Sequence, residues 1–123
     1  MKYKITLLIF TLIAIILYSL VETKDVKHNE KYYQTKFCNE LGGIMEYRLS
    51  DKTRVDCLTD RYAIEVDFAR KWAEGIGQSL YYAEITSKEP AIALIIASNE
   101  ERYLKRLKKV TDKFSIKIFI IEK

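Results

Sequence analysis

The stretch that decides the fold of this chain is TRVDCLTDRYAIEVDFARKWAEGIGQSLYY, residues 53–82. Over 53–58 and again over 63–67, apolar and polar residues alternate with the two-residue period of a β-strand. The four residues 59–62 between these runs predict a tight hairpin loop. From about Phe68 to Glu84 the apolar residues recur at helical spacing instead. The centre of the fold is therefore predicted to be a hairpin followed directly by a helix.

A four-residue loop also predicts which residues of the hairpin face each other. The predicted pairs are Cys57–Ile64, Val55–Val66 and Asp56–Glu65. Directly opposed side chains of an antiparallel pair lie about 5 Å apart at their β carbons. Two carboxylates at that separation repel each other unless a positive charge lies between them. The pair Asp56 and Glu65 is the strongest indication of a functional site in this sequence.

The remaining elements follow from the same periodicities. Asn29 can cap a helix that ends at Gly42, and a strand is predicted over 44–49. The apolar run 91–97 predicts a strand covered on both faces, followed by a helix and a last strand over 115–121. The predicted order after the leader is α-β-β-β-α-β-α-β. The expected class is mixed α/β, with a central mixed sheet flanked by helices.

The first 21 residues differ from the rest of the chain. Lys2 and Lys4 precede an uncharged run over 5–21, and the first acidic residue is Glu22. This layout is typical of an export signal, and about 17 residues is also the lower limit for spanning a bilayer. No clear cleavage site follows, so a cleaved signal peptide and an uncleaved transmembrane helix that anchors the chain in the membrane both remain open.

Either alternative places the rest of the chain outside the cytoplasm. It would be periplasmic or extracellular, or anchored with the C-terminal domain on the outer side of the cytoplasmic membrane. Residues 22–29 are predicted to be a linker and residues 30–123 a single α/β domain. Without Lys2 and Lys4 the net charge falls from +4 to +2. So small a charge neither requires nor excludes a nucleic-acid partner.

The chain has two cysteines, Cys38 and Cys57, and one histidine, His28. In an exported domain an even pair of cysteines favours a disulfide, and two separate buried thiols are the alternative. His28 falls in the predicted linker. The sequence therefore gives little support to catalysis by a serine, histidine or cysteine nucleophile.

A short motif spans the hairpin and the helix after it. Asp56 lies on the second predicted strand, Glu65 on the third, and Gln78 and Tyr82 on the helix. With the order of elements, this pattern resembles the PD-(D/E)xK nuclease superfamily, the restriction-endonuclease-like fold, over roughly 30–121. The phrase around it is also similar to small exported bacterial proteins associated with that superfamily. The chain departs from the pattern at Asp67, which stands where the family has lysine.

The resemblance implies a Mg²⁺-dependent nuclease that hydrolyses the phosphodiesters of DNA or RNA. It assigns catalysis to Asp56, Glu65 and Lys71, metal binding to Asp56, Glu65 and Asp67, and substrate positioning to Gln78 and Tyr82. Lys71, one helical turn after Asp67, would supply the amine that the triplet lacks. Mg²⁺ prefers carboxylate oxygens and would activate a bound water, while the amine would neutralise charge on phosphorus. Glu40, on the first helix, is a weaker candidate.

Each assignment has a structural alternative. Asp67 could cap the helix that follows it, or pair with Arg54 across the strands. Asp56 and Glu65 could be neutralised without any metal by one of the nearby cations, Arg54, Arg61 or Lys71. Lys71 could equally be a solvated surface residue. Gln78 and Tyr82 could simply pack on the sheet.

Two classes of function therefore remain open. The opposed acids and the motif on the helix favour a metal-dependent nuclease. The replacement of the triplet lysine by Asp67 and the small net charge favour a catalytically inactive domain. Such a domain would be held at the membrane through residues 5–21 and would bind a protein or a component of the cell envelope.

Overall fold

The computed structural model describes residues 8–16 and 27–123. Residues 8–16 form a short helix, and the domain begins with helix α2 (Glu30–Glu40). Most of the predicted leader and linker, residues 1–7 and 17–26, lies outside the described residues. Within the described ranges no helix has the length and apolar character to cross a bilayer. The choice between a cleaved signal peptide and a membrane helix over 5–21 falls largely on residues outside the described ranges and stays a prediction.

The domain is built on a five-stranded sheet with the strand order β1-β2-β3-β4-β5. Its elements after α2 are β1 (Ile44–Arg48), β2 (Arg54–Leu58), β3 (Tyr62–Phe68), the short 3₁₀ helix η1 (Ala69–Lys71), α3 (Trp72–Thr86), β4 (Glu89–Ile96), α4 (Glu101–Phe114) and β5 (Lys117–Glu122). β1, β2 and β3 are antiparallel, whereas β3, β4 and β5 are parallel. The predicted order and the mixed sheet are confirmed. The regular helix begins at Trp72 rather than Phe68, because η1 comes first.

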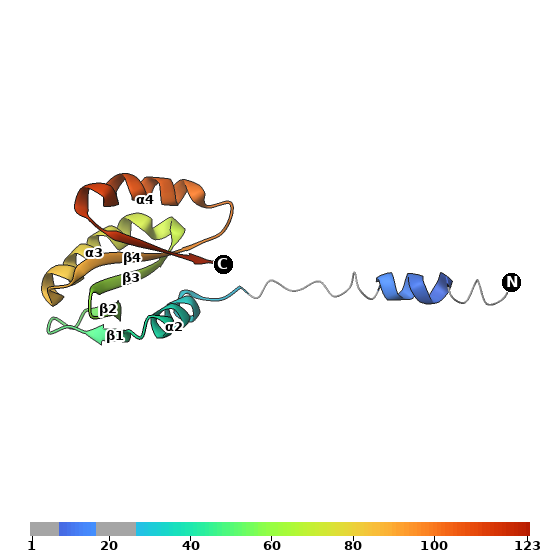
Figure 1. Ribbon diagram of the computed structural model, residues 1–123, viewed down its shortest axis with the longest axis horizontal. Helices are drawn as coiled ribbons and strands as arrows, with labels where there is room; N and C mark the ends of the chain where they lie inside the picture. Colours follow the sequence, from blue (N-terminus) through green and yellow to red (C-terminus); the bar gives the residue numbers. More distant parts are fainter. Residues whose placement is uncertain (1–7, 17–26) are drawn as a thin grey trace.

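The helices form a layer on each face of the sheet (Figure 1). One core cluster joins Cys38 and the aromatic rings of α2 to the face that carries Ile64 and Val66. A second joins α3 and α4 to the opposite face, which carries Ile92 and Leu94. α3 and α4 lie on the same face because each connects parallel neighbouring strands with the same crossover hand.

Strand β4 is the most buried part of the domain. All six residues of 91–96 are buried, and they alternate between the two core clusters. A strand covered on both faces needs apolar side chains at consecutive positions, which explains the unbroken apolar run in the sequence. The prediction of a doubly covered strand is confirmed.

The two cysteines form a disulfide that ties α2 to β2. The sulfurs of Cys38 and Cys57 are 2.07 Å apart, and both residues are fully buried. Gly43 passes directly over the bridge, where an added β carbon would lie 2.5 Å from the sulfur of Cys57 and 2.9 Å from that of Cys38. The predicted disulfide is confirmed, and such a bridge is typical of proteins in oxidising compartments.

Strand β2 changes face part-way along its length, which the sequence pattern does not predict. Val55 and Cys57 are two residues apart and were expected to point the same way. In the structure Cys57 packs in the cluster under α2, whereas Val55 packs with Tyr82 of α3 on the other face. The change occurs at Asp56. In the neighbouring strand Glu46 has a positive φ of 53°, which residues other than glycine rarely adopt.

Candidate functional site

Two acidic side chains of β3 are buried beneath α3. Glu65 and Asp67 alternate along the strand with Ile64 and Val66, which belong to the core on the α2 side. Glu65 is 5% exposed and Asp67 is 4% exposed. An added β carbon on Gly75 of α3 would lie 3.1 Å from Asp67 Oδ2. Both carboxyl groups therefore lie in the layer between the sheet and the helix.

Asp56 joins the site from between the strands. β2 and β3 pair as predicted at Cys57 and Ile64. The backbone pairing predicted beyond that point, between Val55 and Val66, gives way to a side-chain contact. There the N–H of Val66 donates to Asp56 Oδ2 at 2.8 Å. The Asp56 carboxyl group thus replaces a backbone acceptor of the ladder, at the position where β2 changes face.

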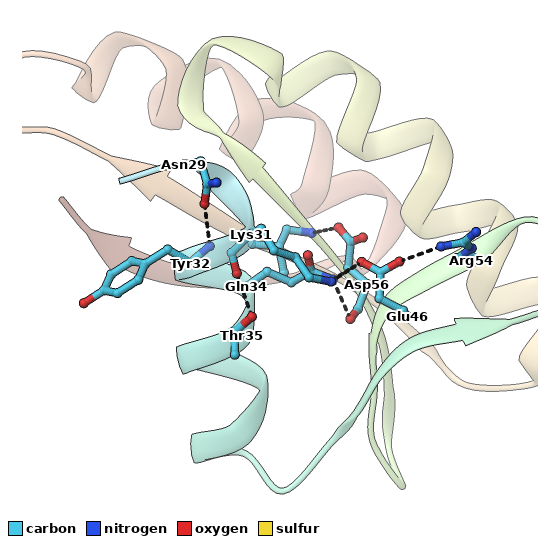
Figure 2. Close-up of polar contacts among 9 residues, drawn as sticks. Asn29, Lys31, Tyr32, Gln34, Thr35, Glu46, Arg54 and Asp56 are labelled. Carbon is cyan, nitrogen blue, oxygen red and sulfur yellow. Dashed lines mark hydrogen bonds and ion pairs between the residues drawn. The ribbon is translucent and has the colours of Figure 1, made fainter. Parts of the chain in front are cut away.

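Helix α2 holds the backbone of Asp56 through Gln34 (Figure 2). The buried amide of Gln34 donates to the Asp56 carbonyl at 2.9 Å and to Glu46 Oε1 at 3.0 Å. Lys31 also contacts Glu46 Oε1, at 2.7 Å. Hydrogen bonds from Lys31, and then from Gln34, hold the pKa of Glu46 below its usual value. This network fixes the position of β2 beside the site.

The arginines expected to neutralise the acids are occupied elsewhere. Arg54 is paired with Glu46 at 3.4 Å, and Arg61 with Glu89 at 3.0 Å. The alternatives in which Arg54 pairs with Asp67, or either arginine neutralises Asp56, find no support among the described residues. Asp67 does not cap a helix either, because neither η1 nor α3 has a side-chain cap. Its position beneath the helix is therefore not explained by capping.

Lys71 is the cation of the site. Its Nζ lies 3.7 Å from Asp67 Oδ1 and 3.4 Å from Glu30 Oε2. The negative charge of Glu30 is the main reason that the pKa of Lys71 lies above its usual value. The amine is therefore charged at neutral pH. The predicted association of Lys71 with the acids is observed for Asp67.

Sequence reasoning missed Glu30. It chose Glu40 as the acid from the first helix, but Glu40 lies at the opposite end of α2, about 15 Å away by the helical rise. The only available signal was an acidic residue in the first turn of that helix. Which end of α2 meets the start of α3 depends on how the helix packs across the sheet, and local spacing does not contain that information.

Burial dominates the protonation of the three acids. Burial, followed by the charges of Asp56 and Asp67, raises the pKa of Glu65 to about 9. Burial, followed by the charge of Glu30, raises the pKa of Asp67 to about 7, although Lys71 opposes this. Burial also raises the pKa of Asp56 to about 6 against the hydrogen bond from Val66. The folded domain therefore favours the protonated form of all three acids, and of Glu65 most strongly.

The chemistry of these acids fits a hard divalent cation. Glu65 Oε2 and Asp67 Oδ2 are buried and have no hydrogen-bond partner in the part of the chain that the structure describes. No group of three or more histidine, cysteine, aspartate or glutamate side chains in residues 8–16 and 27–123 is arranged to hold a metal ion. Mg²⁺, however, is usually bound through one or two carboxylates, with waters and substrate phosphates completing the shell. Two of these acids would therefore be enough.

The two residues of the helix motif have different environments. Tyr82 is 6% exposed and packs with Val55 and Ala63, as its structural alternative proposed. Burial raises the pKa of Tyr82, and a hydrogen bond with Gln78 opposes that shift. Gln78 itself is exposed. A role for either residue in positioning a substrate stays a prediction.

Two glycines of α3 provide a matched test of the close approach between this helix and Asp67. Replacing Gly77 with alanine is expected to stabilise the domain by about 0.5–1 kcal/mol, because nothing lies within 4 Å of the added carbon. Gly75→Ala should gain less or lose stability, since its β carbon presses on Asp67. Thermal unfolding of the two variants checks this. Equal gains in both would show that α3 does not press on the acid.

The structure thus brings Asp56, Glu65, Asp67 and Lys71 to one place between β2, β3 and α3, and it adds Glu30. Comparisons with protein-family models, with curated proteins and with solved structures found no match to this chain. The resemblance to the PD-(D/E)xK superfamily therefore stays a prediction from the sequence.

Proposed function

We propose that residues 30–123 form a Mg²⁺-dependent nuclease domain that hydrolyses phosphodiesters of DNA or RNA. The observation that supports this most directly is that two buried carboxyl groups, Glu65 and Asp67, each have an unpartnered oxygen and lie near the half-buried Asp56 and a charged lysine. Buried polar atoms without a hydrogen-bond partner cost stability unless a ligand or a metal satisfies them. A protein that needed only a stable fold would be better served by apolar residues at these positions.

The residues would divide the chemistry between them. Asp56 and Glu65 would hold the cation, with waters and substrate phosphates completing its shell. Mg²⁺ bound there would polarise the phosphodiester and lower the pKa of a water molecule. Lys71 stays charged because Glu30 and Asp67 lie beside it, so it could neutralise negative charge that develops on phosphorus. Glu30 holds the amine on the side of the site that faces α2.

The compartment proposed for this activity lies outside the cytoplasm. The disulfide between Cys38 and Cys57 supports an oxidising environment. The lysines and the apolar run at the start of the sequence support export or anchoring at the membrane. The nucleic acid would then be extracellular or periplasmic.

A second candidate function is a non-catalytic domain that binds a protein or an envelope component. Two observations favour it. Asp67 replaces the lysine of the family motif, and Lys71 is already engaged by two carboxylates, Asp67 and Glu30. In such a domain the acids would be a remnant of a site, and no cation would be needed.

Cleavage assays distinguish the two candidates. We expect the full chain, kept in a neutral detergent, to cleave single- or double-stranded nucleic acid in Mg²⁺ or Mn²⁺. Glu65→Ala should lower the rate by at least about 100-fold, as expected for a group that acts on the transition state. Glu84→Ala is the control, because Glu84 is an exposed acid of the same helix layer. Activity that survives Glu65→Ala would come from a contaminant and would contradict the proposal.

Calorimetry tests the cation separately. Wild type should release heat on binding Mn²⁺, and Asp56→Ala should release much less. Equal heats from the two proteins would remove Asp56 from the metal site. Metal binding without cleavage would support the non-catalytic alternative.

A further inference from the structure

A cavity of about 370 Å³ lies next to the carboxyl cluster. It is formed where the chain enters α2, where β3 passes into η1, and where β5 ends. Its lining includes Lys27, Glu30, Phe68, Arg70 and Lys123. β3 and β5 each pair in parallel with β4, so the carboxyl ends of these strands lie at the same edge of the sheet. Crevices outside the carboxyl ends of parallel strands are where ligands commonly bind in open α/β sheets.

Positively charged side chains outnumber negatively charged ones in the lining of this cavity. Lys123 is paired with Glu100 at 2.8 Å, and Glu30 is paired with Lys71. Neither Lys27 nor Arg70 has a carboxylate partner among the described residues. Two cations without a counter-charge in one hollow produce a positive potential that favours an anion.

The apolar wall of the cavity is Phe68. Arg70 lies 5.6 Å from the centre of its ring and the amine of Lys123 lies 5.0 Å from it. Phe68 is half-buried against the core on the α2 side, so its exposed part would give a base an apolar contact while the neighbouring cations contact the backbone. Arginine, in addition, can contact a phosphate with two parallel hydrogen bonds.

The cavity and the acids share residues. Glu30 lines the cavity and also contacts Lys71, which in turn contacts Asp67. Arg70 and Lys71 are consecutive in η1, so one cation serves the cavity and the next serves the carboxyl cluster. A strand whose phosphate lies on Arg70 would therefore continue directly to the acids.

We propose that this cavity is a phosphate subsite for single-stranded nucleic acid. Arg70 and Lys27 would hold the phosphate next to the one that is cleaved, and Phe68 would contact the adjoining base. The inference rests on the proposed nuclease function and names a binding element of the same site. It requires no metal, so it can be tested without catalysis.

Fluorescence anisotropy with a labelled single-stranded oligonucleotide tests the subsite. The full chain is kept in a neutral detergent with EDTA, which prevents metal-dependent cleavage. Arg70→Gln should weaken binding about tenfold and reduce the slope of log affinity against log salt by about one. The control is Lys105→Gln, an exposed lysine of α4 outside the cavity, which should change affinity by less than about twofold. Inorganic phosphate should displace the oligonucleotide from wild type more effectively than sodium chloride at equal ionic strength.

Three results would overturn the inference. One is unchanged affinity in Arg70→Gln, and another is an equal loss in Lys105→Gln, which would indicate only general charge attraction. The third is binding of the protein to mixed micelles of detergent and phosphatidylglycerol but not to the oligonucleotide, which would assign the cavity to a lipid headgroup. Binding that depends on Arg70, in a protein that never cleaves in Mg²⁺, would support the subsite and refute only the proposed nuclease activity.

Discussion

Replacing Glu65 with glutamine is expected to stabilise the domain at alkaline pH and to abolish metal-dependent cleavage. Both effects follow from the fact that glutamine cannot ionise. Burial raises the pKa of Glu65 to about 9 from an ordinary value of 4.5. The folded domain therefore favours the protonated acid, and ionising it in the folded state costs free energy. Glutamine has a similar shape and no charge to ionise, but it cannot serve as an anionic metal ligand.

The sign of the pH dependence follows from this shift. A pKa raised in the folded state contributes stability that is fully present below about pH 4.5, the ordinary value, and that is lost as pH rises toward 9. The contributions of Asp67 and Asp56 to stability are also lost as pH rises, but over lower pH ranges, because their pKa values are raised to about 7 and about 6. The free energy of unfolding of wild type should therefore fall between pH 5 and pH 9.

Urea unfolding, followed by the fluorescence of the single tryptophan Trp72, measures this directly. Between pH 5 and pH 9 wild type should lose at least about 1.4 kcal/mol more than Glu65→Gln, the equivalent of one pKa unit. Glu84→Gln, which changes an exposed acid, should behave as wild type. Parallel pH curves for wild type and Glu65→Gln would contradict the burial of an unpaired acid. Added Mg²⁺ should flatten the curve of wild type alone, because a cation favours the ionised acids.

Removing the disulfide should have the largest effect on stability. The double variant Cys38→Ser, Cys57→Ser is expected to lose about 3 kcal/mol of unfolding free energy, from the chain entropy that a crosslink of this loop length removes. The bridge spans a sequence separation of 19 residues. A domain of this size has about 5–15 kcal/mol in total, so the loss is a large fraction.

The measurement is denaturant unfolding of the oxidised protein, the reduced protein and the double variant. The reduced protein and the double variant should unfold at similar, lower denaturant concentrations. An unchanged midpoint in both would show that packing of α2, rather than the bridge, holds the helix to β2. Because α2 also carries Gln34 and Glu30, we expect the double variant to bind Mn²⁺ more weakly than wild type.

The hairpin shows which features of strand pairing and packing can be predicted from the local sequence pattern. The alternation over residues 53–67 and the four-residue loop were enough to predict the pairing of Cys57 with Ile64, which the structure confirms. They were not enough to predict that Val55 packs on the α3 side. The alternation rule assumes a regular ladder, and Asp56 interrupts it by accepting a hydrogen bond from Val66 with its side chain.

The helix motif gives a similar lesson. Helical spacing over 68–84 left open whether Tyr82 positions a substrate or packs on the sheet. In the structure Tyr82 is buried in a small cluster with Val55 and Ala63, whereas Trp72 and Ile76 pack on the cluster that β4 forms with α4. Helical periodicity identifies neighbours on one helix, but which stripe meets the sheet depends on the second helix that shares the layer. That helix is α4, and the contact between them is tertiary.

The amino-acid sequence by itself determined the order of the elements, the doubly covered strand, the disulfide and the acidic positions of β2 and β3. These follow from residue period, turn chemistry and composition, which act over a few neighbouring residues. Only the tertiary structure decided that Glu30 reaches Lys71, that the arginines pair elsewhere, and that Glu65 and Asp67 are buried with an unpartnered oxygen each. Those outcomes depend on how separate elements pack, since charge pairing and burial are set by groups distant in the chain.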